Sequence, residues 1–316
     1  MRYRVRFTTP EDVAQCATLS RDAPLLSLEE SRQRTVLWRL WLQQGSATSV
    51  VIEELETESI VAFGLTVAVR DWAVELAREG ERHLAACLLS ERAVMDAQEV
   101  LRAHRGEGVH LVGFYGWQGE EVKSLDSEVH RMLLHSFLRL HRGLHLRSFT
   151  KEVYGKAEAQ SYLDMGCTLW REPADFPPRS QWIQPYVVGA DRETLATLQR
   201  RVTFLYDLFF YYHRPVVHLR RSQLILAQLA WLMEMSDEQI ATLLGIGETA
   251  VLQRWCRLYD TIEQAQPEWN CHSANHKRQA LLYLLSRKPQ EAMPLCIGHL
   301  FYNTPQAAKQ FSIPLP

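Results

Sequence analysis

The stretch MSDEQIATLLGIGETAVLQRWCRLY, which occupies residues 235–259, has the pattern of two helices joined by a tight turn. Ser236 and Gln239 stand at the spacing of a capping box, which marks the beginning of a helix. Gly245 readily adopts a positive φ, as residues that end helices commonly do. A second helix is predicted to begin near Gly247, with inward side chains at helical intervals: Val251, Trp255 and Leu258. The stretch therefore predicts a helix–turn–helix.

The predicted second helix carries polar side chains on its outward face. A helix–turn–helix lays its second helix in the DNA major groove, so double-stranded DNA is the expected partner. Gln253 and Arg254 are expected to reach base edges, because glutamine suits adenine and arginine suits guanine. Phosphate contacts are expected from hydroxyl and basic side chains on and around the motif, namely Thr249, Arg257, Arg220, Arg221, Lys277 and Arg278.

The charge of this region works against DNA binding. Between Arg221 and Glu263 the sequence has three basic and six acidic side chains, a net charge of −3, whereas affinity for DNA comes largely from cationic contacts to phosphate. The flanking basic residues would have to complete a positive surface. A helical module that binds protein is the alternative interpretation.

At these residues the sequence resembles the C-terminal DNA-binding domain of LuxR/NarL-type transcription regulators. The residues that carry the resemblance stand in the family's order: Met235-Ser236, Gln239-Ile240-Ala241, Leu244-Gly245-Ile246 and Val251. Gly247 and Ala250 depart from the serine and threonine usual in that family. Sigma-factor promoter-reading domains and resolvase-type arms share the same core pattern. The resemblance implies a DNA-binding transcription regulator that acts as a homodimer, since one helix reads only a half-site.

The first half of the chain alternates between strand and helix patterns. Apolar or alternating runs predict strands at residues 3–7, 49–54, 60–69, 109–117, 145–153 and 167–171. Within 60–69, large side chains on one face alternate with small ones on the other. The clearest amphipathic helix is 128–141. Together these elements predict an α/β (α+β) domain with a mixed sheet, followed by an all-α C-terminal domain.

Two segments resemble the GNAT (N-acetyltransferase) superfamily, RVRFTTPED at residues 4–12 and SYLDMGC at residues 161–167. In active members a tyrosine four residues before a glycine protonates the departing thiolate of coenzyme A, so the resemblance implies Tyr162 as the catalytic position. Such enzymes bind the coenzyme A pyrophosphate on bare backbone amides in a glycine-containing loop. Here residues 118–128 offer one glycine, Gly119, and four acids, which would repel a polyphosphate.

This loop favours a non-catalytic GNAT-like domain that senses a small-molecule or protein effector or assists assembly, without a cofactor. The leading hypothesis is therefore a transcription regulator with such an N-terminal domain. The alternative is an acyl-CoA-dependent N-acyltransferase with a helical accessory domain, which would use acetyl-CoA. A non-catalytic protein-interaction module is the third hypothesis.

Length and composition fit a globular protein of about two domains. The 316 residues are 47% hydrophobic and 23% charged, and the formal net charge of −2 gives no overall attraction to DNA or to anionic membranes. A proline-rich segment at 172–180 predicts a domain boundary. We expect a GNAT-like domain at 1–172, a linker and bridging helix at 173–217, a helix-turn-helix domain at 218–290 and a tail at 291–316.

The cysteine pattern and the absence of long apolar runs predict a cytoplasmic protein with no membrane partner. The six cysteines form no CxxC pair, which indicates a reducing compartment, and no apolar run reaches membrane length. Two groups have partial metal-ligand spacing, His141 with His145, and Cys271 with His272 and His276. Neither has a full ligand set, so no metal site is predicted.

Overall fold

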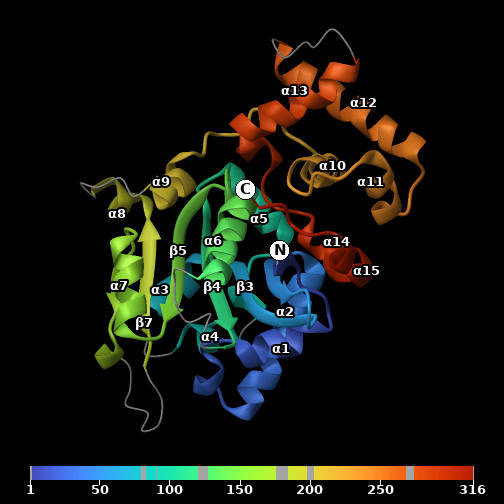
Figure 1. Ribbon diagram of the computed structural model, residues 1–316. Helices are drawn as coiled ribbons and strands as arrows, with labels where there is room; N and C mark the ends of the chain where they lie inside the picture. Colours follow the sequence, from blue (N-terminus) through green and yellow to red (C-terminus); the bar gives the residue numbers. More distant parts are fainter. Residues whose placement is uncertain are drawn as a thin grey trace.

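The computed structural model describes residues 2–79, 83–89, 91–119, 127–175, 184–197, 203–267 and 274–315 (Figure 1). Its strands are β1 (Tyr3–Phe7), β2 (Ala47–Glu54), β3 (Ser59–Val69), β4 (Val109–Trp117), β5 (Leu146–Val153), β6 (Thr168–Arg171) and β7 (Tyr186–Asp191). Its first nine α-helices are α1 (Asp12–Leu19), α2 (Leu28–Gln44), α3 (Asp71–Glu79), α4 (Leu84–Cys87), α5 (Ala97–Arg105), α6 (Glu128–His141), α7 (Lys156–Asp164), α8 (Arg192–Thr197) and α9 (Thr203–Phe210). The remainder are α10 (Arg221–Trp231), α11 (Asp237–Leu244), α12 (Glu248–Ala265), α13 (Ala274–Arg287), α14 (Gly298–Asn303) and α15 (Pro305–Gln310).

The seven strands form one sheet in the order β1-β2-β3-β4-β5-β7-β6. The β4–β5 pair is parallel and the other pairs are antiparallel. The predicted mixed sheet and the helical C-terminal part are therefore confirmed. Residues 120–126, 176–183 and 198–202 lie outside the described residues; they take up most of the loop after β4 and part of the predicted linker.

The seventh strand was not anticipated from the sequence. Residues 186–191 were assigned to a bridging segment, and 167–171 to the last strand; instead β7 lies between β5 and β6. The strand is short and contains Gly189, where a Cβ atom would lie 2.3 Å from the Trp170 ring. Glycine lets that ring pack on the strand, but it also weakens the strand pattern in the sequence. The boundary at residue 172 stays a prediction, with one strand of the sheet beyond it.

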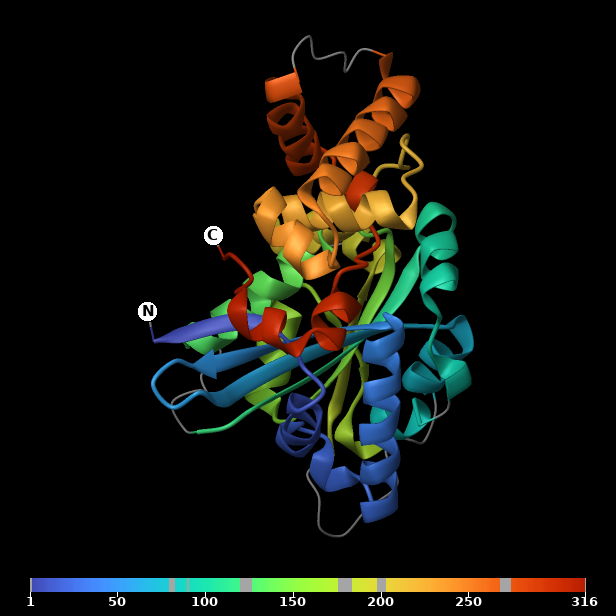
Figure 2. The ribbon, with the colours of Figure 1, turned by 90° about the vertical axis from the view of Figure 1, so that its right-hand side faces the viewer.

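Helices cover both faces of the sheet. The α6 helix packs over β1, β2 and β3 on one face, whereas α1 and α2 pack on the other (Figures 1 and 2). On β3, Phe63, Leu65 and Val67 belong to the core beneath α1 and α2. The intervening Gly64 and Thr66 line the α6 side, so the large side chains are all turned away from α6.

The C-terminal helices belong to the same hydrophobic core as the sheet. A single cluster of buried side chains includes residues of β1 and β2 together with residues of α10 to α15. The predicted tail at 291–316 is part of it: Phe301 stacks on Phe7 with ring centroids 4.9 Å apart, and the Ile313 N–H donates to the Val5 carbonyl at 2.8 Å. The two ends of the chain consequently lie near each other (Figures 1 and 2).

The two predicted helices of the 235–259 stretch form with the expected caps. Ser236 and Gln239 make the reciprocal capping box of α11, and Gly245 ends that helix at φ 63°. The Gly247 backbone caps α12 without a side-chain hydrogen bond. None of the helices in the described ranges has the length and apolarity needed to span a bilayer.

A buried ion network fixes the start of the sheet. The Arg6 guanidinium donates to Asp12 Oδ2 at 2.6 Å and to Glu53 Oε1 at 3.2 Å, and all three side chains are buried. Burial alone would raise the pKa of Asp12, but Arg6 and the hydrogen bonds from Thr9 together hold that pKa below its ordinary value. The RVRFTTPED segment thus links β1 to α1 and β2 through one arginine.

We expect Arg6→Met to lower the free energy of unfolding by about 3 kcal/mol at pH 7, because it leaves the buried Asp12 carboxylate without its ion-pair partner, while Glu53 keeps Arg4. A depressed carboxyl pKa stabilises the fold above the ordinary value and loses that effect as pH falls through the folded value. The deficit should therefore shrink below about pH 4. Urea unfolding across pH checks this, with Arg32→Met at an exposed 4.0 Å pair with Glu29 as the control. Equal losses in both variants would contradict the assignment.

Candidate functional site

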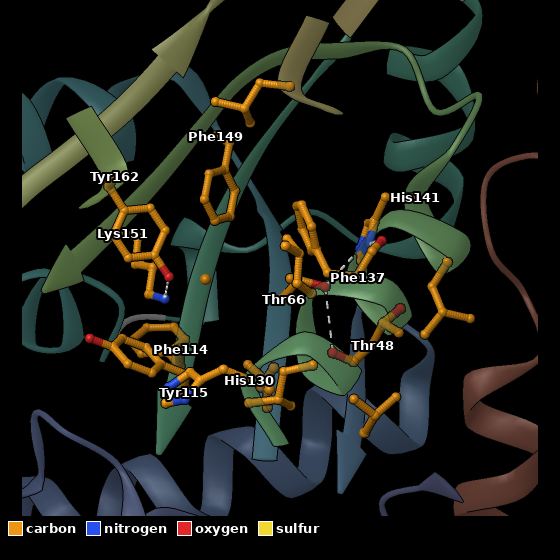
Figure 3. A pocket seen from close by; sticks show the side chains of 18 of the residues that line it. Thr48, Thr66, Phe114, Tyr115, His130, Phe137, His141, Phe149, Lys151 and Tyr162 are labelled. Atoms are coloured by element: carbon orange, nitrogen blue, oxygen red, sulfur yellow. Dashed lines mark hydrogen bonds between the residues drawn. The ribbon is translucent and has the colours of Figure 1, made fainter. Parts of the chain in front are cut away.

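A cavity of about 180 Å³ lies between α6 and the sheet (Figure 3). Its floor is formed by β2, β3, β4 and β5, and Leu133 and Phe137 of α6 contribute to its roof. The cavity exists because small residues face α6 where large ones would fill the space: Gly64, Thr66 and Gly113. Thr66 and Gly113 stand directly opposite each other in the β3–β4 register.

The cavity ends where β4 and β5 diverge. The two strands pair from Val109 to Gly113 on β4, and the last partners are Gly113 and Lys151. Beyond that point β4 continues to Trp117 alongside β3, while β5 continues to Val153 alongside β7. The divergence leaves a gap between the strands, and the side chain of Lys151 lines the cavity there.

Lys151 is surrounded by aromatic and phenolic groups (Figure 3). Its Nζ donates a hydrogen bond to the hydroxyl of Tyr162 on α7. The same Nζ lies 3.4 Å from the ring centroid of Tyr115 and 4.4 Å from that of Tyr162, distances at which a cation is attracted to an aromatic face. The Tyr115 hydroxyl in turn donates to Glu158. The arrangement holds a single amine at the end of an otherwise apolar cavity.

Burial shifts the proton affinities of these groups. It lowers the pKa of Lys151 to about 8, although the carboxylate of Glu158 acts in the opposite direction. Burial, and then the charge of Glu158, raises the pKa of Tyr162 above its ordinary range, so the phenol stays protonated. Burial also raises the pKa of the nearby Cys167 thiol to about 12, which makes it a poor nucleophile. Near neutral pH Lys151 is therefore protonated but close to its pKa, whereas Tyr162 and Cys167 hold their protons tightly.

The groups that close the opposite end of the cavity form hydrogen bonds with one another. Thr66 Oγ1 and His141 Nε2 lie 2.9 Å apart, and His141 Nδ1 lies 2.7 Å from the Phe137 carbonyl. Burial lowers the pKa of His141 to about 4, so the ring is neutral. This end presents no charge, and Figure 3 shows it well separated from the lysine.

A smaller pocket lies on the other side of β4. Gly113, Phe114 and Tyr115 line both pockets, and the smaller one adds the carboxylates of Asp22 and Glu152. Asp22 is 97% buried, and its Oδ2 has no hydrogen-bond partner among the described residues. Glu152 is held by the Leu84 N–H at 2.6 Å and the Tyr154 hydroxyl at 3.1 Å. Two carboxylates therefore lie across β4 from the lysine.

Among the predicted site residues, the structure brings Tyr162 into this cavity. Lys151 was not predicted. Its one signal in the sequence is a lysine inside a strand whose neighbours are largely buried, and that pattern alone does not distinguish a buried amine from an exposed one. In the described part of the chain, no cluster of three or more His, Cys, Asp or Glu side chains could hold a metal ion; Cys271 and His272 lie outside it.

The residues predicted to contact DNA lie apart from the cavity, on the C-terminal helices. On α12, Thr249, Gln253 and Arg257 are exposed and Arg254 is half-buried. Arg220 and Arg221 at the start of α10 are also exposed, and Arg221 lies 3.2 Å from His299.

The two basic side chains predicted on α13 are paired with carboxylates. Arg278 donates to Asp237 at 2.6 Å and to the Met235 carbonyl at 2.9 Å, while Lys277 pairs with Glu263 at 2.5 Å. These contacts fasten α13 to α11 and α12. They also neutralise the charge that was expected to meet phosphate.

Comparison with known proteins gives matches among solved structures alone. The sequence matches no protein-family model and no curated protein. The spermidine/spermine N-acetyltransferase SpeG from Vibrio cholerae covers 63% of this chain and 98% of its own, at 10% identity and a TM-score of 0.38. NAA60 from Arabidopsis thaliana, solved with acetyl-CoA, covers 60% of this chain and 99% of its own, at 14% identity and a TM-score of 0.39. The GNAT domain of S. lividans PAT covers 60% of this chain and 90% of its own, at 13% identity and a TM-score of 0.35.

The matched proteins include a spermidine/spermine N-acetyltransferase and a GNAT domain, and the N-terminal part has the mixed sheet that was predicted for it. Similarity at this level identifies neither a substrate nor a reaction for the chain. The main functional prediction, a DNA-binding transcription regulator, was wrong: the basic side chains predicted on α13 are paired with carboxylates, and the matched structures named above are a spermidine/spermine N-acetyltransferase, NAA60 with acetyl-CoA and a GNAT domain. The LuxR/NarL resemblance has no support among them, and α11 and α12 remain a helix–turn–helix by local geometry alone.

We expect Lys151→Met to stabilise the fold near neutral pH. A pKa lowered from 10.5 to about 8 means that burial of the charged amine costs about 3 kcal/mol below pH 8, partly offset by about 1 kcal/mol of cation–π attraction. The folded state binds fewer protons than the unfolded chain between pH 8 and 10.5, so this cost disappears as pH rises through that window.

Urea unfolding at pH 7 and pH 10.5 measures the effect. The free energy of unfolding of Lys151→Met should exceed that of the wild type by about 2 kcal/mol at pH 7 and should equal it at pH 10.5. The exposed Lys156→Met is the matched control and should change little at either pH. A loss of stability at pH 7 would show that the amine is not buried at a cost.

Proposed function

We propose that the chain transfers an acyl group from a thioester to an amine in the gap between β4 and β5. The observation that carries the proposal is the Lys151–Tyr162 pair, which holds a proton at the end of an apolar cavity. Acyl transfer from a thioester requires an apolar place for the acyl chain and a proton donor for the leaving sulfur. Both features meet at the last paired residues of the two strands.

The residues present fit the acyl end of such a donor. Leu and Phe side chains are the most frequent in the cavity lining, with Lys151 and Tyr162 at one end and Thr66 and His141 at the other. Fewer features of the chain fit the binding of the nucleotide and pyrophosphate of coenzyme A. Residues 118–128 contain one glycine, and the Tyr115 carbonyl on the diverging edge of β4 already accepts the Arg21 N–H at 3.1 Å. The proposal is therefore an acyl thioester, with coenzyme A as one carrier to be tested.

A bound thioester supplies an activated carbonyl carbon and a thiolate leaving group. The hydroxyl of Tyr162 holds the proton that neutralises this thiolate, and Lys151 Nζ, which donates to that hydroxyl, restores the proton. The two proton affinities are well matched, because the pKa of Lys151 is about 8 and an ordinary thiol has a pKa of about 8.5. Tyr162 alone would be a reluctant acid, since burial raises its pKa.

The acceptor amine is assigned to the smaller pocket across β4. Asp22 Oδ1 is paired with the buried Arg34 at 2.8 Å, but its Oδ2 offers an acceptor that no described residue uses, and the Glu152 carboxylate beside it attracts a protonated amine. Glu152 takes the proton that the amine must lose before its nitrogen attacks the carbonyl carbon. The carbon–nitrogen bond forms as the carbon–sulfur bond breaks, and the amine is released as an amide. Gly113, which lines both pockets, lets the reactants approach each other.

We expect Tyr162→Phe to lower kcat by about a hundredfold or more, the usual contribution of a positioned proton donor. The measurement is thiol release from an acyl-pantetheine thioester in the presence of 1,4-diaminobutane. Tyr283→Phe, at a hydroxyl whose ring is exposed, is the matched control and should keep the wild-type rate. Thiol release by Tyr162→Phe at the wild-type rate would remove the proposed role.

The pH dependence provides a second test. Lys151 gives up its proton above about pH 8, so kcat should fall as pH rises through that value. In Lys151→Met the rate should be low, and this alkaline decline should be absent. A wild-type rate that keeps rising to pH 10 would show that protonated Lys151 is not required.

A further inference from the structure

The cavity is much longer than an acetyl group requires. Its lining runs from Lys151 on β5 across β4 and β3 to Thr48 and Val50 on β2, and these four strands are consecutive neighbours in the sheet. Adjacent strands lie about 4.8 Å apart, so three steps across the sheet span roughly 14 Å. An extended chain advances roughly 1.2 Å per bond, to judge from a fully extended backbone. Length alone would therefore admit about twelve bonds.

The volume sets a tighter limit than the length. A protein cavity of about 150 Å³ accommodates benzene, which has six carbons. The 180 Å³ here corresponds by the same scale to about seven carbons. A two-carbon acetyl group would leave most of this space empty, and a sixteen-carbon chain would not be enclosed.

We propose that the cavity takes a medium-chain acyl group of roughly six to eight carbons, with its carbonyl beside Lys151 and its methyl end between β3 and α6, near Gly64. This inference rests on the proposed function for the thioester chemistry, but the binding of the chain rests on the cavity alone. Apolar side chains line much of the path, with Leu133, Leu140 and Phe149 among them. The cation at one end selects a ligand with an oxygen-bearing head, and the neutral Thr66–His141 pair at the other end selects against a second charge.

The small residues of β3 are the specificity determinants in this arrangement. A Cβ atom added at Gly64 would point between β3 and α6, and its nearest neighbour would be Leu133 Cδ2 at 3.6 Å. The Cβ atom itself makes only an ordinary van der Waals contact, so a larger side chain would extend into the space that we assign to the acyl chain. Gly64→Val should convert the cavity from a medium-chain to a short-chain site.

Isothermal titration calorimetry of the full chain with sodium octanoate, sodium acetate and sodium hexadecanoate tests the inference without requiring turnover. Each buried methylene contributes about a fourfold gain in affinity. Octanoate should therefore bind at least about a hundredfold more tightly than acetate, and hexadecanoate should gain nothing further. Equal affinity for octanoate and acetate, or a gain that continues to sixteen carbons, would overturn the inference.

Two variants make the test specific to the cavity. Gly64→Val should weaken octanoate binding by at least about tenfold, because its added carbons displace part of the chain, and should leave acetate binding unchanged. Gly247→Val is the matched control, since a Cβ atom there meets nothing within 4 Å. Thermal unfolding confirms that both variants fold. Octanoate binding that is unchanged in folded Gly64→Val would place the ligand elsewhere and overturn the inference.

Turnover then separates this inference from the proposed function. Faster thiol release from octanoyl-pantetheine than from acetyl-pantetheine supports both. Tight octanoate binding without thiol release from either thioester supports the medium-chain cavity and overturns acyl transfer. Equal release from both thioesters, with no preference in binding, keeps acyl transfer and overturns the chain-length assignment.

Discussion

The divergence of two parallel strands after Gly113 and Lys151 is the constraint on which the rest of the site depends. Parallel strands share a continuous ladder of hydrogen bonds, and here the ladder stops while both strands continue with other partners. At this gap the Lys151 side chain lines the cavity on one side of β4. The smaller pocket lies on the other side of the same strand, close to the lysine. Were β4 and β5 paired to their ends, neither the amine nor a path between the pockets would exist.

A charged amine in an apolar cavity is costly, and its surroundings show what offsets the cost. Lys151 contacts a phenol oxygen and two aromatic faces rather than a carboxylate. An ion pair would have fixed its charge, whereas aromatic contacts stabilise the cation only weakly and leave its pKa near 8. Strongly shifted groups in a cavity are a feature of functional sites, although structural networks also shift pKa values. The Arg6 network is such a structural case, and there each charge has a partner.

The sequence predicted those parts of the molecule that local pattern determines. The alternation in β3, the apolar run of β4 and the stripe of α6 place these elements correctly, and the face of small residues on β3 proved to be the floor of the cavity. Lys151 and β7 were missed because each depends on distant contacts: the lysine is buried by Tyr162 on α7, and Gly189 serves the Trp170 ring. The regulator prediction erred by assigning a function to a helix–turn–helix whose nearby basic residues, Lys277 and Arg278, are used to hold helices together. The predicted homodimer stays a prediction.

The protonation of Lys151 is the most direct test of this account, because both the cavity's chemistry and its cost to the fold follow from that one buried amine. Heteronuclear NMR of the folded chain, with the Lys151 resonance assigned by comparison with Lys151→Met, would follow its titration. We predict a midpoint near pH 8, well below the ordinary lysine value of about 10.4. A midpoint at the ordinary value would mean that Lys151 is solvated, and the proposed proton donor would then lose its physical basis.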